Sequence, residues 1–169
     1  KRLSEQEHGS VALETMLRGI CKKENFLDLL ENFILFDHSG GHTAKILARN
    51  HQYLGVNEAI KAYEGRKLNN GKLGVFWHTQ GSGKSYSMVF LAQKIRRKFS
   101  GSPTIVILTD RDELNTQISD TFENCGILGK AKASQFIASS GDDLIDKLKG
   151  NPSFIFTLVQ KFNKTDVEP

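Results

Sequence analysis

The chain has 169 residues, 38% of them hydrophobic and 25% charged, which fits one soluble globular domain with a sizeable buried core. No apolar run approaches the ~18–20 residues of a membrane-spanning helix, which excludes an integral membrane protein. The net charge of +4 permits a polyanionic partner without requiring one. Cys21 and Cys125 lie far apart without the spacing of metal ligands, as is typical of reduced thiols in the cytosol. Because the first residues carry neither an initiator methionine nor a signal pattern, we expect an interior piece of a longer chain.

The N-terminal part of the sequence is predicted to be helical. Residues 10–35 read as two helical segments, and the second lies within ENFLDLLENFILF, where apolar residues recur at helical spacing. The stretch DHSGGHT (37–43) breaks this pattern with two glycines and ends at Thr43, a candidate N-cap. A long helical pattern then covers residues 44–63. Of this part, residues 1–40 are expected to be a helical connecting segment.

After a turn cluster, EGRKLNNGK, strands and helices alternate, which is the pattern of an α/β fold with a parallel sheet. Three strands are predicted, at LGVFW (73–77), TIVILT (104–109) and SFIFTL (153–158), and three helices, at 83–99, 111–124 and 142–149.

The loop HTQGSGKS (78–85) has the features of a phosphate-binding loop. A predicted strand precedes it, two glycines allow backbone N–H groups to approach phosphates, and a predicted helix begins at its end. Lys84 would contact the β- and γ-phosphates of ATP, and the Ser85 hydroxyl would bind Mg²⁺. The general pattern GxxxxGK[ST] fails only at His78, whereas the looser helicase form, with glycines three and one residues before the lysine, is satisfied. The candidate nucleotide-binding residues in the loop are Gln80, Gly81, Ser82, Gly83, Lys84 and Ser85.

Taken with three other blocks, this loop resembles the motor-and-nuclease (R) subunit of type I restriction-modification enzymes. Members of that family carry a histidine at the place of His78, followed by Thr-Gln-Gly-Ser-Gly-Lys-Ser. The resemblance continues through RNHQYLGVNEAI, TIVILTDRDELNTQ and FIFTLVQKF, in that order. It covers about residues 17–162.

The resemblance implies a superfamily 2 DNA translocase with a nuclease domain before two RecA-like motor domains. Residues 1–40 would then leave an upstream nuclease domain, and 41–169 would form the N-terminal part of the first RecA-like P-loop NTPase domain. The parent would use ATP and Mg²⁺ to pump double-stranded DNA and cleave unmodified foreign DNA in the prokaryotic cytoplasm. Its partners would be methyltransferase and specificity subunits.

The resemblance also implies roles for residues outside the loop. Gln52 and Arg49, in RNHQ, match the glutamine motif, in which an amide reads the adenine edge with one donor and one acceptor. For an isolated glutamine, an exposed polar position on a helix is the alternative. DNA-backbone contacts are implied at the ends of the second and third strands, by Thr109, Arg111, Thr157, Gln160 and Lys161. The alternatives are a helix capped by Asp110 with Glu113 in a capping box, and a polar strand end.

Hydrolysis by such motors also needs a magnesium-binding carboxylate, a glutamate that orients water and an arginine finger. No DExx box occurs in the 169 residues, so we expect no catalytic residue here and, in isolation, weak nucleotide binding without turnover. Three other readings stay open at this point: another superfamily 2 helicase or translocase, a P-loop phosphotransferase, and a non-enzymatic DNA-binding module with a vestigial loop.

Overall fold

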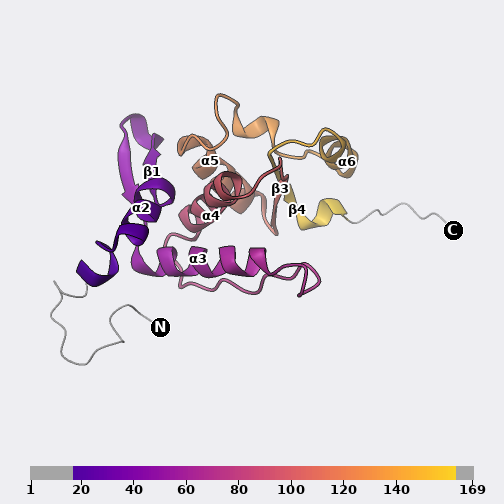
Figure 1. Cartoon of the computed structure of the whole chain (residues 1–169). Coiled ribbons are helices and arrows are strands. Elements are labelled where there is room, and N and C mark those ends of the chain that lie inside the picture. The colour runs from indigo at the N-terminus through magenta and orange to yellow at the C-terminus, as the bar shows by residue number, and fades with distance from the viewer. Residues whose placement is uncertain (1–16, 163–169) are drawn as a thin grey trace.

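The computed structural model describes residues 17–162 (Figure 1). Helices and strands follow one another in the order α2 (Lys23–Asn32), β1 (Ile34–Asp37), β2 (Ala44–Leu47), α3 (Asn50–Glu64), α4 (Lys84–Lys98), β3 (Ile105–Thr109), α5 (Asp112–Asn124), α6 (Gly141–Lys149) and β4 (Phe154–Leu158). Short 3-10 turns lie at Ser39–Gly41, Ala133–Gln135 and Val159–Phe162. Most of the first helix predicted within 10–35 lies outside the described residues. Within residues 17–162, no helix is both long and apolar enough to cross a membrane.

An antiparallel hairpin occupies a stretch that was predicted to be helical. β1 pairs with β2 from Ile34 opposite Leu47 to Asp37 opposite Ala44. The prediction of helix through residue 35 and from residue 44 was therefore wrong, and Thr43 is not an N-cap but a loop residue bonded to the ring of His38. The apolar run Phe33–Phe36 fits either structure, and the turn with Gly40 and Gly41 at positive φ lets two short strands pair.

The parallel sheet is smaller than predicted. β3 and β4 pair in parallel, from Ile105 opposite Phe154 to Thr109 opposite Leu158, which confirms two of the three predicted strands. The third prediction, a strand at residues 73–77, is wrong, because this segment pairs with no strand within residues 17–162. It runs on the surface, with Val75 94% and Trp77 77% exposed. A strand needs a neighbour to satisfy its backbone groups, and no described segment lies in that position.

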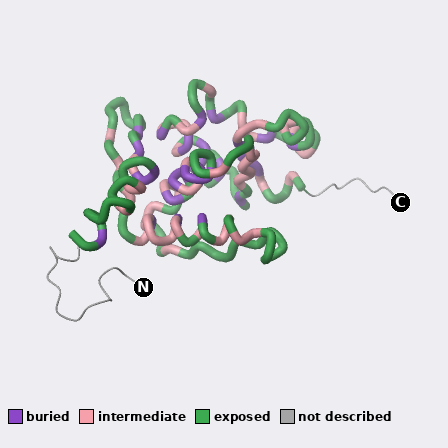
Figure 2. The backbone as a smooth tube through the Cα atoms, in the orientation of Figure 1, coloured by how far each residue is buried: buried purple, intermediate pink, exposed green. Residues whose placement is uncertain are grey.

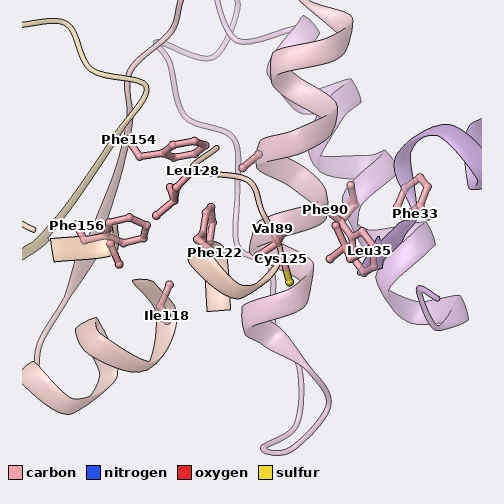
Figure 3. Packing of buried hydrophobic residues seen from close by; sticks show 13 residues of the cluster. Phe33, Leu35, Val89, Phe90, Ile118, Phe122, Cys125, Leu128, Phe154 and Phe156 are labelled. Carbon is pink, nitrogen blue, oxygen red and sulfur yellow. The ribbon is translucent and has the colours of Figure 1, made fainter. Parts of the chain in front are cut away.

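Helix α4 lies at the centre of the molecule, between α3 and α5 (Figure 1). Buried residues gather along it, while the outer faces of the surrounding helices are exposed (Figure 2). Its adjacent residues Val89 and Phe90 are completely buried, and Phe90 meets Phe33 at a ring-centroid distance of 5.7 Å. On the other side Phe122 of α5 packs edge-on against Phe154 and Phe156 of β4 (Figure 3). The core thus extends from the hairpin side, through α4, to the parallel strands.

A buried polar cluster fixes α4 to the two preceding helices. Lys94 of α4 is only 6% exposed and forms an ion pair with Asp28 of α2, while its ammonium also donates to Asn57 Oδ1 of α3 at 2.6 Å. Asn32 Nδ2 donates to Asp28 Oδ1 at 2.9 Å. Burial opposes the ionisation of Asp28, but the contacts with Lys94, Asn32 and Asn57 hold its pKa below the usual 3.8. The segment before residue 40 therefore packs directly against the helix that follows the candidate loop.

Candidate nucleotide-binding site

The phosphate-loop candidate adopts the shape that its glycines allow. Gly81 and Gly83 have φ of +76° and +85°, in the left-handed region that favours glycine, and α4 begins directly after them at Lys84. A Cβ on Gly83 would also lie 2.9 Å from Gln52 Nε2, so a larger residue here would displace the Gln52 amide. His78 is not among the residues with positive φ. The loop therefore has no conformational need for glycine at its first position, which explains how it accommodates a histidine.

Backbone N–H groups at the start of α4 are available to an anion. The first backbone hydrogen bond of this helix runs from Ser87 N–H to the Gly83 carbonyl, at 3.1 Å. The N–H groups of Lys84, Ser85 and Tyr86 have no acceptor within residues 17–162. Unpaired donors in the first turn, reinforced by the positive end of the helix dipole, favour a phosphate group at this end.

Two side chains of the loop add to these donors. Lys84 is exposed, and its ammonium donates to the Thr79 carbonyl at 3.1 Å, so the cation lies over the loop itself. Ser85, half-buried in the first turn, is the predicted Mg²⁺ ligand. Gln80 is exposed in the turn before Gly81. Within residues 17–162 no cluster of three or more His, Cys, Asp or Glu side chains could hold a metal ion.

Gln52 lies in the first turn of α3 and touches the loop. It is 3% exposed; its Oε1 accepts the N–H of Arg49 at 2.8 Å, and its Nε2 donates to the Gly83 carbonyl at 2.9 Å. The exposed, solvated glutamine that was the alternative is therefore wrong. Arg49 is the N-cap of α3 and is exposed. Gln52 therefore lies beside the candidate phosphate loop and holds it through the Gly83 carbonyl.

Two residues at the loop were not predicted from the sequence. His51 Nε2 donates to the Ser82 carbonyl oxygen at 3.1 Å, and the His51 ring packs against His78 at a centroid distance of 4.7 Å. Tyr86, next to Ser85, donates its hydroxyl proton to Asp37 Oδ2 at the end of β1. The hydrogen bond to Asp37, together with burial, raises the pKa of Tyr86 to about 12. Neither role could be predicted from the sequence pattern, because each residue acts through a contact distant in sequence.

The predicted DNA-contacting residues gather where β3 and β4 end, as the parallel pairing requires. Arg111 is exposed, and its Nε lies 3.5 Å from an Asp110 carboxylate oxygen. Gln160 Nε2 donates to the Asp110 carbonyl at 3.0 Å, and Lys161 donates to the Ala138 carbonyl. Thr109 is 7% exposed, with its hydroxyl 3.4 Å from the Arg111 carbonyl. The structure thus joins the ends of the two predicted blocks through a direct hydrogen bond.

Two predictions at this edge are corrected. Thr157 is completely buried between neighbouring elements, so its side chain cannot reach a DNA backbone in this arrangement. The predicted capping box of Asp110 and Glu113 is absent, because α5 begins after Arg111, which makes no side-chain capping hydrogen bond. The first turn of α5 therefore keeps backbone donors that a capping side chain would otherwise occupy.

Residues 51–169 match the SWI2/SNF2 ATPase family. The chain belongs to that family. The match starts at His51 and includes the whole phosphate loop and the parallel strands. For this SWI2/SNF2 ATPase chain, the mixed helix-and-strand structure with a small parallel sheet agrees with the predicted α/β class.

Individual relatives of this SWI2/SNF2 ATPase chain confirm the resemblance drawn from its motifs. The chain is 38% identical over 162 residues to the type I restriction enzyme HindI endonuclease subunit of Haemophilus influenzae. This alignment covers 92% of the chain and 15% of that protein. It is 33% identical over 159 residues to a protein of Methanocaldococcus jannaschii provisionally named the type I restriction enzyme MjaIXP endonuclease subunit, over 90% of the chain and 14% of that protein. The chain therefore spans about one seventh of the length of these relatives.

Proposed function

We propose that this chain is the N-terminal part of a RecA-like motor domain, and that it holds the phosphates of ATP in a type I restriction enzyme subunit. In this proposal the whole subunit uses ATP to move double-stranded DNA and cleaves unmodified DNA. It works in the cytoplasm with methyltransferase and specificity subunits. The relatives support the enzyme class, since they are endonuclease subunits of such enzymes.

The unpaired N–H groups of Lys84, Ser85 and Tyr86 carry the proposal. They lie in the first turn of α4, after two glycines with positive φ, and beside the ammonium of Lys84. This donor set fits a polyphosphate: several backbone donors, one mobile cation and the positive end of a helix dipole. Ser85 offers one hydroxyl oxygen, and Mg²⁺ in nucleotide sites is bound by few protein ligands together with phosphate oxygens.

Each group has a separate role. The N–H groups of Lys84, Ser85 and Tyr86, together with that of Gly83, bind phosphate oxygens, and the Lys84 ammonium moves from the Thr79 carbonyl to the β- and γ-phosphates. Ser85 holds Mg²⁺, which neutralises phosphate charge when bound. Gln52 and Arg49, at the start of α3, are the proposed adenine contacts, and Gln52 keeps one N–H and one lone pair beyond its two hydrogen bonds for the base.

The end of the parallel strands is the proposed DNA contact. Arg111 is exposed there, Gln160 and Lys161 lie beside it, and Thr109 shapes the turn between β3 and α5. Because contacts of this kind read phosphates and not bases, we expect no sequence preference from them.

ATP hydrolysis by the full-length subunit tests the proposed function. The subunit, assembled with its partners, should hydrolyse ATP in the presence of unmodified double-stranded DNA. Lys84→Ala should abolish the DNA-stimulated hydrolysis. The matched control is Lys72→Ala, which removes an exposed lysine from the turn before the loop and should leave the rate unchanged. Hydrolysis that persists in Lys84→Ala would contradict the proposal, as would ATPase turnover by the isolated 169-residue chain, for which we propose binding only.

A further inference from the structure

Two adjacent residues of α3 hold two adjacent carbonyls of the phosphate loop. His51 Nε2 lies 3.1 Å from the Ser82 carbonyl oxygen, and Gln52 Nε2 lies 2.9 Å from the Gly83 carbonyl oxygen. Both carbonyl oxygens are acceptors, so His51 must donate from Nε2, and that nitrogen must carry a proton. The first turn of α3 therefore supplies two side-chain donors, from His51 and Gln52, to the loop.

The orientation of a carbonyl fixes the next N–H group. In a planar trans peptide the C=O and the following N–H point in opposite directions. A hydrogen bond from His51 to the Ser82 carbonyl therefore turns the N–H of Gly83 away from α3, and the bond from Gln52 to the Gly83 carbonyl does the same for the N–H of Lys84. These are two of the donors that the proposed function assigns to phosphate.

The two carbonyls differ in how many other hydrogen-bond donors they have. The Gly83 carbonyl also accepts the N–H of Ser87 at 3.1 Å and the Ser87 hydroxyl at 3.3 Å, so α4 holds it without Gln52. Within residues 17–162, the Ser82 carbonyl has His51 as its one hydrogen-bond partner. The orientation of the peptide between Ser82 and Gly83 therefore depends on His51.

The ring of His51 is held in turn by His78. The two ring centroids are 4.7 Å apart, and His78 packs edge-on against Phe76 at 4.4 Å. The histidine that replaces the first glycine of the general loop pattern thus supports the residue that orients the loop. A glycine at this position would remove the ring contact with His51.

We propose that His51 is a positioning residue for phosphate binding, which orients the N–H of Gly83 toward the ligand and is itself held by His78. This inference rests on the proposed nucleotide-binding function of the loop. It assigns to the histidine of RNHQ a role separate from base reading by Gln52.

Titration of the 169-residue chain with ATP, and separately with adenosine, tests the proposal. His51→Leu removes the donor while filling similar space, and His51→Gln places an N–H donor close to the position of Nε2. His51→Leu should weaken ATP binding about tenfold, which is the effect of losing the hydrogen bond from the Gly83 N–H to a charged phosphate. His51→Gln should recover most of the affinity. Adenosine lacks phosphates, so its affinity should not change. The control His42→Leu removes an exposed loop histidine and should bind ATP as the unchanged chain does.

The amide signal of Gly83 provides a second measurement, in nitrogen-15 NMR spectra during addition of inorganic pyrophosphate. The signal should shift in the unchanged chain and in His51→Gln, and should stay in place in His51→Leu. Unchanged ATP affinity and a normal Gly83 shift in His51→Leu, with binding lost in Lys84→Ala, would overturn the inference alone. If the unchanged chain bound neither ATP nor pyrophosphate, the proposed function itself would fail.

Discussion

Gly55 of α3 lies directly against the ring of Phe76, and a Cβ at residue 55 would come within 1.8 Å of Phe76 Cε2. A glycine in the middle of a helix usually costs stability, so its presence here reflects the close approach of the segment that leads into the phosphate loop. Phe76 in turn packs against His78. The contact therefore links the middle of α3 to the first residue of the loop.

Gly55→Ala should reverse the usual effect of this substitution. An alanine in a helix interior normally stabilises by about 0.5–1 kcal/mol relative to glycine. Here the new methyl group must displace the Phe76 ring and, through it, His78, so we expect a lower midpoint of urea unfolding and weaker ATP binding. Gly65→Ala, at the C-cap of α3 with no atom closer than 3.8 Å to the added Cβ, is the control. A stabilised Gly55→Ala chain with normal ATP affinity would show that the contact does not constrain the loop.

The buried pair of Lys94 and Asp28 should be costly to break from one side. Lys94→Met leaves the Asp28 carboxylate without its cation, and we expect a loss of about 3 kcal/mol in the free energy of unfolding, at the low end for such pairs because the Asp28 side chain is 23% exposed. The double variant Asp28→Leu with Lys94→Met should recover much of this loss, because two apolar groups can replace a buried pair. Lys61→Ala, in an exposed pair with Glu58, should leave stability nearly unchanged. Urea denaturation of the four chains measures these differences, and equal effects of Lys94→Met and Lys61→Ala would contradict the assignment.

His78 should make the stability of the chain depend on pH. Partial burial, with His51 and Lys84 nearby, holds the pKa of His78 below its usual 6.5. As pH falls, His78 therefore takes up a proton in the unfolded chain before it does so in the folded chain. The stability that neutral His78 contributes is fully present above pH 6.5 and is lost as pH falls below it. The melting temperature should fall between pH 7 and pH 5, and His78→Gln should flatten part of that slope. An identical pH profile in His78→Gln would exclude His78 as a source of the dependence.

Arg111 should contribute to DNA binding without sequence preference. If its guanidinium contacts a phosphate, Arg111→Ala should weaken binding equally for unrelated duplexes and reduce the slope of log affinity against log salt by about 1. Lys130→Ala, an exposed cation beyond the other end of α5, should change neither quantity. Fluorescence anisotropy at several salt concentrations measures both. A loss confined to one DNA sequence would indicate a base contact instead.

Local sequence signals predicted the C-terminal half of the fold well. Helices α4, α5 and α6 and strands β3 and β4 lie within one or two residues of their predicted bounds, because glycines, Pro103 and continuous β-branched runs delimit them. The hairpin was missed because Phe33–Phe36 is an apolar run that fits a helix or a strand, and pairing with β2 decides between them. The strand at 73–77 was predicted from its apolar composition, but a strand also needs a neighbour to pair with, and none lies beside this segment within residues 17–162.

In the candidate site, too, local sequence features could be predicted and contacts between distant residues could not. The phosphate loop could be predicted because its glycines, lysine and serine follow each other in sequence. His51, Tyr86 and the pair of Asp28 and Lys94 could not, since their partners lie 31, 49 and 66 residues away. Gln52 was predicted for its amide, but its hydrogen bond to Gly83 depends on how α3 packs against the loop.

The most direct test of the central claim is calorimetric titration of the 169-residue chain with ATP and Mg²⁺, compared with Lys84→Ala and with the control Lys72→Ala. If the start of α4 binds phosphates, the unchanged chain and Lys72→Ala should bind ATP with equal affinity, and pyrophosphate should compete with it. Lys84→Ala should lose most of the binding. ATP binding of equal strength in all three chains, without competition by pyrophosphate, would contradict the assignment of a nucleotide site to this loop.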